Sequence, residues 1–160
     1  MQNFDASSII YAWDNYPILQ FPGLWSWIGV QVTAKYIVMS SVAYDEVDKK
    51  IPECADWLRD KTIELLFPAN AILQEALRIK HLLGIDGDEY HAKGVGENDL
   101  FIIATSSIIN AELVSNEGRQ SQALDMPKKR KIPAVCAMSE VGVACINFIE
   151  YIKRTNVVFG

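Results

Sequence analysis

Short apolar runs alternate with helix-like segments along the whole chain, and this alternation restricts the possible folds more than any other feature. The β-branched run at residues 36–39 is typical of a buried strand. Residues 72–83 repeat apolar side chains at three- and four-residue spacing, which is typical of a helix. Strands that alternate with helices form a parallel sheet with helices on its faces. The sequence therefore predicts an α/β fold with three layers, α/β/α, around a central and mostly parallel sheet.

The bounds of these elements follow from local start and stop signals. Proline is favoured in the first turn of a helix, serine and asparagine at the cap before it, and glycine just after its end. Polar or glycine-rich stretches over residues 84–97 and 117–133 are expected to be a connection and a loop. Strands are expected over residues 3–5, 36–39, 112–115 and 143–146; helices are expected after Asp5, from Pro22, from a cap at Ser40 or Ser41, from Pro52, over residues 68–83, from a cap at Asn98 to Ile109, and over residues 148–152.

Four acidic residues lie where apolar runs end or where the next helix begins: Asp5, Glu46, Asp99 and Glu117. The carboxyl ends of neighbouring strands in an open α/β sheet share one crevice. Four carboxylates in that crevice would repel one another unless a divalent cation neutralised them. Oxygen ligands without cysteine or paired histidine suit Mg²⁺ or Mn²⁺. The sequence therefore predicts a hard-metal site, and such sites commonly serve phosphoryl chemistry.

Each of these acids also has a purely structural explanation. Asp5 is a favoured residue type for the cap of the following helix. Asp99 would be stabilised in the first helical turn by the helix dipole. Glu117 would be an ordinary turn residue, and Glu46 competes with two other acids on its helix. Metal ligation is the preferred interpretation for Asp5, Glu46 and Asp99 because the acids fall in register, whereas for Glu117 both interpretations stay open.

A basic run near the end of the expected loop is the second candidate site. The net charge of −5 gives no general attraction to nucleic acid, so any such contact needs a local basic patch. This run would grip phosphates of a nucleic acid, dock an acidic partner segment, or remain a solvated loop. It also resembles a nuclear-localisation cluster. The residues of this candidate patch are Arg119, Lys128, Lys129, Arg130 and Lys131.

Composition sets further limits on the chain. Its 160 residues, half of them apolar, are expected to form a single domain over residues 1–160. The longest apolar stretches are far shorter than the roughly 20 residues that a membrane span needs, and a basic secretory signal is absent. Three cysteines without a CxxC pair are expected to be buried, reduced thiols of a cytoplasmic protein. Most of the four tryptophans are expected in the core, but Trp25 is expected to be exposed and to mark a partner surface.

The order of the acids resembles that in the PIN-domain nucleases, a family that includes the toxin halves of many prokaryotic toxin–antitoxin pairs. That family opens with an apolar strand that ends in Asp and is followed, after one residue, by a hydroxyl or amide residue. Asp5 and Ser7 match this pattern. Its second acid is a Glu several residues into the helix after the second strand, and Glu46 stands there. The resemblance covers the chain from Asp5 to about Ile152.

The later motifs follow the same order. The third acid of the family begins a helix of the form Asp-x-x-Ile-Ala-x-Ala, which resembles the stretch from Asp99 with one extra apolar residue. Its last motif, Thr/Ser-x-Asp, is matched by Ser115 and by Glu117, which stands in place of Asp. The segment of residues 118–133 is longer and more basic than the corresponding segment in compact members of the family. It resembles a PIN-like subgroup in which a basic run leads into Ile-Pro-x-Val-Cys, here residues 132–136.

The resemblance implies a metal-dependent endoribonuclease, a VapC-like toxin of a type II toxin–antitoxin module. Asp5 and Asp99 would be the primary ligands of one or two Mg²⁺ or Mn²⁺ ions, and Glu46 and Glu117 would complete the site or orient water. The resemblance further implies an RNA substrate, a cognate antitoxin protein as partner, and a homodimer formed through apolar helices. The supporting residues would be Ser7 and Ser115.

Two alternatives remain open at this point. The same fold and metal site would also serve a structure-selective DNA nuclease. A PIN-like scaffold that binds RNA or protein without cleavage is the other alternative, and the short first strand and Glu117 favour it. A comparison of RNA and DNA substrates separates the two nucleases, and metal dependence separates both from a binding module.

Overall fold

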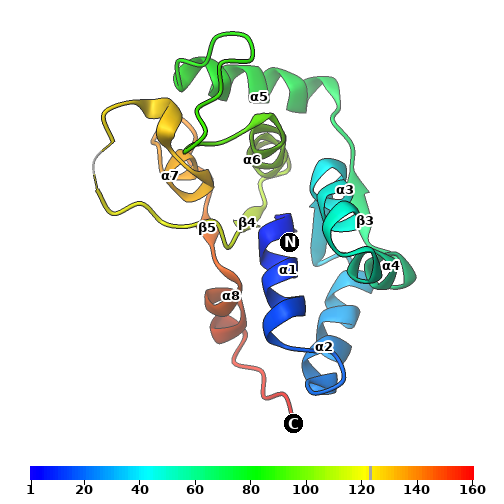
Figure 1. The fold of residues 1–160 in the computed structure, drawn as a ribbon. Helices are drawn as coiled ribbons and strands as arrows, with labels where there is room; N and C mark the ends of the chain where they lie inside the picture. The colour runs from blue at the N-terminus through cyan, green and yellow to red at the C-terminus, as the bar shows by residue number, and fades with distance from the viewer. Residues whose placement is uncertain (123) are drawn as a thin grey trace.

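A five-stranded parallel sheet forms the middle layer of the computed structural model, which describes residues 1–122 and 124–160 (Figure 1). The strand order is β3-β2-β1-β4-β5, and all four pairings are parallel. Because β1 is the central strand, its carboxyl end lies between those of β2 and β4. The strands are β1 Gln2–Phe4, β2 Ile37–Ser40, β3 Glu64–Leu66, β4 Glu112–Val114 and β5 Cys145–Ile146.

Helices cover both faces of this sheet, which confirms the three-layer α/β/α prediction (Figure 1). Two of them begin at prolines as expected, because the ring fixes a helical φ and the missing N–H is not needed there. The helices are α1 Ala6–Asn15, α2 Pro22–Thr33, α3 Ser41–Lys50, α4 Pro52–Asp60, α5 Asn70–Leu82, α6 Glu97–Ile109, α7 Ile132–Cys136 and α8 Phe148–Thr155, with a 3-10 turn, η1, at Pro127–Lys129.

Two parts of the sheet and its connections differ from the sequence-based expectation. Strand β3 was not expected, because its three half-buried residues are too few to show a periodic pattern. The loop expected over residues 117–133 contains η1 and the first residues of α7, and it includes residue 123, which lies outside the described residues. The other expected strands and helices are confirmed to within a few residues at each end.

The caps of two helices also differ from expectation. Helix α6 begins two residues earlier than predicted, with Gly96 rather than Asn98 at its N-cap. The Asp99 carboxylate closes this end, because it accepts a hydrogen bond of 2.9 Å from the Gly96 N–H. Ser40 does hold the N-cap position of α3, but its side chain makes no capping bond and its hydroxyl is buried without a partner among the described residues.

The expectation that Trp25 is exposed is wrong. Only 2% of its surface is accessible, and its ring packs edge-to-face between those of Trp13 and Trp57, at centroid distances of 5.2 and 5.0 Å. The indole N–H donates to the carbonyl oxygen of Tyr16 at 2.6 Å. Trp25 is therefore a core residue and marks no partner surface.

Burial and helix length bear on two further expectations. Cys54 and Cys136 are buried thiols as predicted, while Cys145 is only half-buried. No helix among residues 1–122 and 124–160 combines the length and apolar character needed to cross a membrane.

The basic run is held in place by its backbone rather than left as a free loop. The Val95 N–H donates to the Arg130 carbonyl oxygen at 2.9 Å. The Gln120 carboxamide accepts from the Lys131 N–H at 2.9 Å and donates to the Lys129 carbonyl oxygen at 3.0 Å. These contacts join residues far apart in the sequence, so the run has a fixed place beside the start of α6.

Gly94 is the closest point of this contact, and its replacement is expected to destabilise the protein. A Cβ at Gly94 would lie 1.9 Å from the Lys128 carbonyl oxygen, so the two segments would have to move apart. We expect Gly94→Ala to lower the free energy of unfolding by about 1–3 kcal/mol, measured by chemical denaturation. Gly118→Ala is the control, because no heavy atom of the described residues lies within 4 Å of its Cβ position. Equal stability of the two variants would contradict the tight contact.

Candidate functional site

The four predicted acids share one electrostatic environment at the carboxyl edge of the sheet. The pKa of Asp5 is raised to about 6, mainly by burial; hydrogen bonds from Ser7 and Ser115 oppose this rise, and the charges of Glu46 and Glu117 contribute to it. Burial likewise raises the pKa of Asp99 to about 7, with added effects from the charges of Asp5, Glu117 and Glu46. The charges of the other acids therefore act on Asp5 and Asp99 although the four come from different parts of the chain.

Asp5 is the most buried of these acids and is held by two serines. It occupies the N-cap position of α1, but its side chain makes no capping bond, so the purely structural explanation fails for its carboxylate. Ser7 and Ser115 both donate hydroxyl hydrogen bonds to Oδ2 of Asp5, the second at 3.1 Å. Within the described residues Oδ1 makes no hydrogen bond, yet it is not sealed from solvent. One carboxylate oxygen is thus fixed and the other is available.

The two serines are in turn fixed by the segment that follows β4. The Asn116 N–H donates to the Ser7 hydroxyl oxygen at 2.9 Å, and the Glu117 N–H donates to that of Ser115 at 3.2 Å. The backbone of Asp5 extends the pairing of β1 with β4, because its N–H donates to the Val114 carbonyl oxygen at 2.9 Å. Ser7 and Ser115 are therefore both fixed beside the Asp5 carboxylate, and their supporting role in a metal site stays a prediction.

A buried asparagine joins the strand of Asp5 to the helix of Asp99. Asn3 is fully buried on β1, and its amide donates to the Ile102 carbonyl oxygen at 3.2 Å and to the Ser106 hydroxyl at 3.0 Å. A buried amide without such partners would carry a desolvation cost. Asn3 therefore fixes the position of α6 against the central strand, and with it the relative placement of the two acids.

Lys50 belongs to this site, although the sequence pattern did not identify it. Its ammonium group lies 2.7 Å from Oε1 of Glu46, one helical turn earlier on α3. The hydrogen bond to Glu46 raises the pKa of Lys50, and the charges of Glu46, Asp5 and Glu117 contribute. The acid at position 46 is half-buried whereas those at 45 and 48 are exposed, as the motif predicted. A pair four residues apart on a helix was visible in the sequence, but its direction toward the crevice was not.

The donor set suits a hard divalent cation, although the side chains do not form a finished cage. Among residues 1–122 and 124–160, no three acidic, histidine or cysteine side chains converge closely enough to hold an ion as they stand. The carboxylate of Glu46 is turned to Lys50, and that of Asp99 to Gly96. Carboxylate and hydroxyl oxygens at this edge are ligands of the type that Mg²⁺ or Mn²⁺ prefers. Ion binding would require the two carboxylates to leave these partners.

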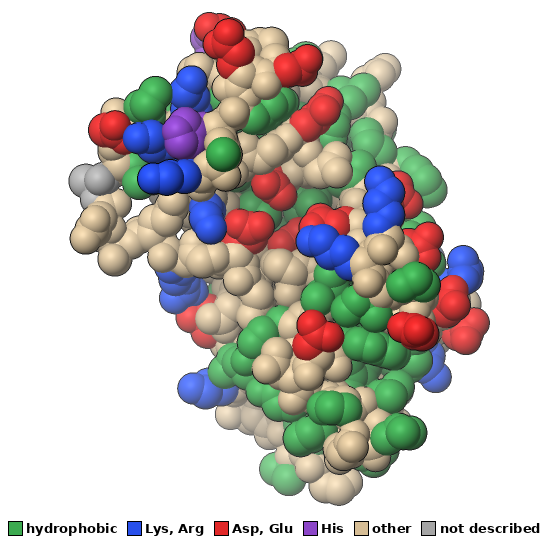
Figure 2. Space-filling view, viewed as in Figure 1, with side chains coloured by type: hydrophobic (Ala, Val, Ile, Leu, Met, Phe, Trp, Pro, Cys, Tyr) green, Lys and Arg blue, Asp and Glu red, His purple; other side chains and the backbone are tan. Residues whose placement is uncertain are grey.

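Acidic and basic side chains gather next to each other on one face of the molecule (Figure 2). Acidic groups occupy the middle of that face, where α3, β4 and the start of α6 meet, and basic groups lie at the upper left, over the region of η1 and the connection before α6 (Figures 1 and 2). Lys129 pairs with Asp125 at 2.8 Å, and no ion pair of Lys128, Arg130 or Lys131 is found among the described residues.

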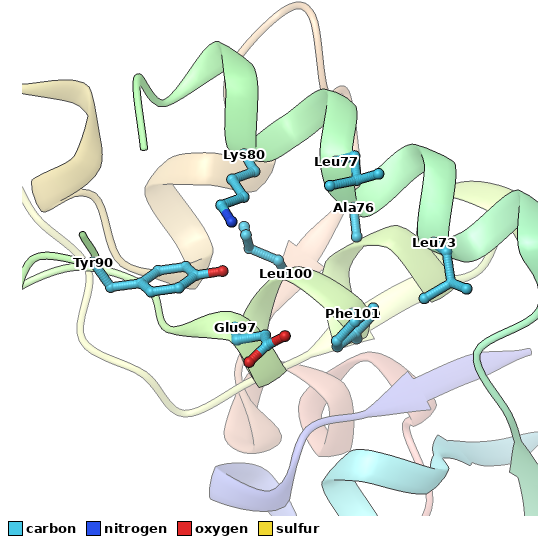
Figure 3. A pocket seen from close by; sticks show the side chains of 8 residues that line it. All are labelled: Leu73, Ala76, Leu77, Lys80, Tyr90, Glu97, Leu100 and Phe101. Atoms are coloured by element: carbon cyan, nitrogen blue, oxygen red, sulfur yellow. The ribbon is translucent and has the colours of Figure 1, made fainter. Parts of the chain in front are cut away.

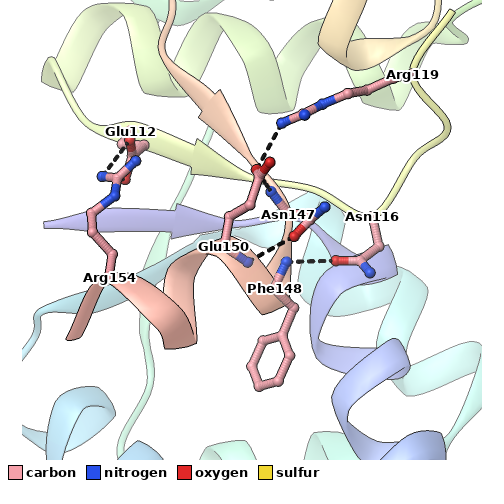
Figure 4. A network of polar contacts seen from close by, with 7 residues as sticks. All are labelled: Glu112, Asn116, Arg119, Asn147, Phe148, Glu150 and Arg154. Carbon is pink, nitrogen blue, oxygen red and sulfur yellow. Dashed lines mark hydrogen bonds and ion pairs between the residues drawn. The ribbon is translucent and has the colours of Figure 1, made fainter. Parts of the chain in front are cut away.

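Arg119 does not extend freely into solvent. Its guanidinium donates at 2.7 Å to Glu150, which also accepts from the Asn147 N–H at the start of α8 (Figure 4). Three-fifths of the Arg119 side chain remains exposed, so the group is positioned but still accessible. The candidate phosphate contacts therefore form two separate groups, one at Arg119 and one at residues 128–131.

An apolar pocket of about 240 Å³ lies apart from the acids, between α5 and α6 (Figure 3). Leu73, Leu77 and Phe101 line its apolar side, and Lys80 and Glu97 stand at its polar end. Glu97 precedes Asp99 by two residues but faces this pocket, so it is not a fifth member of the acidic group.

The protein has a three-layer α/β/α, PIN-like fold, and its carboxylates lie at the carboxyl edge of the parallel sheet. Residues 3–159 match a family described as "Domain of unknown function (DUF4411)", and the chain belongs to that family. No curated protein matches the chain.

Among solved structures, the chain is similar to VapBC2 from Rickettsia felis, crystallised with a DNA fragment from its promoter. The TM-score is 0.51 and the sequence identity is 16%, over 91% of this chain and 97% of that chain. At this identity the similarity shows the fold alone, and it agrees with the parallel sheet and flanking helices described above.

The burial of Asp5 predicts an unusual pH dependence of stability in the absence of metal. Its folded pKa of about 6 lies above the ordinary value of 3.8, so the folded protein keeps a proton that the unfolded chain loses between these values. This group therefore lowers stability as pH rises from about 4 to 6. We expect the free energy of unfolding of Asp5→Asn to exceed that of wild type by about 1–2 kcal/mol at pH 8. This difference should vanish near pH 4.

Chemical denaturation in EDTA at the two pH values measures this difference. Asp48→Asn is the matched control, because Asp48 is an exposed acid on α3 and should show little change at either pH. A loss of stability in Asp5→Asn that is equal at both pH values would show that burial does not penalise the carboxylate.

Proposed function

We propose that this protein is a metal-dependent endoribonuclease and the toxin of a type II toxin–antitoxin module. The observation that carries the proposal is the group of four carboxylates at the carboxyl edge of a parallel sheet, whose burial and charges raise the pKa of Asp5 to about 6 and that of Asp99 to about 7. Burial of such a group of carboxylates destabilises the fold unless their negative charge is compensated. A bound cation would supply that compensation. The PIN-like fold and its similarity to VapBC2 support the same assignment.

Asp5 and Asp99 would hold the ion, and Glu46 and Glu117 would complete the site or orient water. A divalent ion there supplies activation of water and compensation of the charge that develops on a phosphodiester. Ser7 and Ser115 fix one oxygen of Asp5 and leave the other free, so the carboxylate is already oriented. Lys128, Arg130 and Lys131 would offset the repulsion between the acidic edge and RNA.

The partner in this proposal is an antitoxin protein. VapBC2 names a pair of proteins on a promoter fragment, and by analogy a partner would cover the acidic edge and block it. A homodimer remains a prediction from the family resemblance. The structure-selective DNA nuclease stays as an alternative within the same chemistry, and the substrate panel described next distinguishes it.

A non-catalytic binding module is the second candidate function, because Glu46 is engaged by Lys50 and no preformed cage of ligands exists among the described residues. Such a module would bind metal weakly, and its partner binding would be unaffected by Asp5→Asn. Metal-dependent cleavage by the wild type excludes it.

Cleavage of a panel of RNA and single-stranded DNA substrates, with Mn²⁺, Mg²⁺ or EDTA, tests the proposal. We expect RNA to be cleaved only with metal, and Asp5→Asn and Asp99→Asn to lower the rate by at least about 100-fold, since each removes a charge that holds the ion. The same variants should relieve growth arrest in cells. Cleavage of DNA alone would favour the DNA nuclease, and full activity of both folded variants would refute the catalytic assignment.

Lys50 is expected to compete with the metal ion for Glu46. We expect Lys50→Met to bind Mn²⁺ about two- to fivefold more tightly than wild type, because an exposed ion pair contributes less than about 1 kcal/mol. Isothermal titration without substrate measures this directly. Lys49→Met removes the same charge from an adjacent exposed position and is the control for net charge. Equal affinities of the two variants would show that Lys50 does not occupy the metal position.

A further inference from the structure

A second pocket, of about 310 Å³, lies directly beside the acidic edge between the ends of β4 and β5. Ser115 and Glu117 line it on the side of the acids, and Ser115 is the residue that donates to Asp5. Its size falls at the lower end of the range for small-molecule pockets. A ligand bound in this pocket would therefore lie next to any phosphate group that is bound at the candidate metal centre.

Two carboxamides in this pocket have fixed orientations (Figure 4). The oxygen Oδ1 of Asn116 accepts from the Phe148 N–H at 2.9 Å, and that of Asn147 accepts from the Glu150 N–H at 2.8 Å. Since both oxygens are occupied by N–H groups at the start of α8, the free ends of the two side chains are their amide NH₂ groups. No hydrogen bond from either NH₂ group is found among the described residues. Both amides therefore have unused NH₂ donors, whereas each oxygen already accepts one hydrogen bond.

Arg119 adds further donors at the same pocket. Its guanidinium is held by Oε2 of Glu150, the oxygen that also accepts from the Asn147 N–H at 3.0 Å (Figure 4). One guanidinium nitrogen is occupied in this way, and the group has five N–H donors in all. The polar groups of the pocket are thus mostly donors that are fixed before any ligand binds.

The remaining walls are apolar, and they favour a nucleobase over a bare phosphate as the ligand. Pro133, Ile146 and Cys145 line the pocket together with the donors. A phosphate would gain nothing from these apolar walls and would be repelled by Glu117. A flat base can pack against them while its edge accepts hydrogen bonds. Guanine presents two acceptors, O6 and N7, on one edge, whereas adenine presents N7 beside a donor amine.

We propose that this pocket binds a nucleobase with acceptors on its edge, guanine in preference to adenine. Resting on the proposed nuclease function, the pocket would hold the base of the nucleotide next to the cleaved phosphodiester. Asn116 and Asn147 are then specificity-determining residues, because their unused NH₂ groups are donors that match acceptors on the edge of the base. The site would direct cleavage to positions beside guanine.

Binding of nucleoside monophosphates to the full chain in EDTA tests the pocket without any cleavage. We expect GMP and IMP, which share O6 and N7, to bind about five- to tenfold more tightly than AMP and 7-deaza-GMP, in proportion to the lost hydrogen bond. Isothermal titration or chemical-shift perturbation measures the affinities. Equal affinity for GMP and AMP, or binding of neither, overturns the proposal.

The variants Asn116→Asp and Asn147→Asp separate base recognition from folding. Each keeps an oxygen that accepts from the helix N–H, and aspartate is a good N-cap, but each loses its amide donors. Both should weaken GMP binding about fivefold or more beyond the weakening that the added charge causes in AMP binding. Asn147→Ser keeps a capping residue and adds no charge, and it should weaken GMP binding in the same way.

Asn98→Asp is the charge-matched control, because it adds the same charge at an exposed residue of the first turn of α6, outside the pocket. Unchanged GMP binding in the two pocket variants, or an equal loss in the control, overturns the role of the amides. GMP selectivity in a protein that cleaves no RNA would refute the nuclease proposal but keep the base pocket. RNA cleavage without GMP selectivity would refute the base pocket but support the nuclease proposal.

Discussion

The repulsion among buried carboxylates is the constraint on which the rest of the site depends. Asp5 is almost inaccessible, its pKa is raised by burial, and the charges of Glu46 and Glu117 act on it from neighbouring elements. Two serine hydroxyls and the Lys50 ammonium offset part of this cost, because they bring hydrogen bonds and a positive charge to the acids. The positive charge of Lys50 thus compensates part of the negative charge that the acids bring to this edge.

The order of the strands creates the crevice before any side chain is considered. With β1 in the centre, the residues that follow β1 and β4 are adjacent, and Asp5 and Ser115 meet although 110 residues separate them. Asn3 then joins the same strand to α6 through a buried amide. The positions of Asp5 and Asp99 are therefore consequences of the sheet and of one polar contact between strand and helix.

Much of this arrangement could be predicted from the sequence, because it depends on local patterns. Apolar runs, prolines and acids at strand ends were sufficient for the layers of the fold and for the association of the four acids. What failed depends on contacts between distant segments. Trp25 is covered by residues of other helices, and Gly96 rather than Asn98 caps α6 because Asp99 reaches back to it. The direction of Lys50 and the fixed amides at α8 also require tertiary structure.

The placement of the basic residues resolves a conflict in the proposed function. An acidic edge attracts a metal ion but repels RNA, and a net charge of −5 adds to that repulsion. The Arg130 carbonyl accepts from Val95, four residues before Asp99, so the basic run is tied to the start of the helix that carries an acid. Arg119 is fixed at the ends of β4 and β5, and the next residue, Gln120, bonds to the backbone of the basic run. Positive charge thus gathers beside the carboxylates without entering them, and under the proposed function it would attract the phosphates of an RNA strand to the acidic edge.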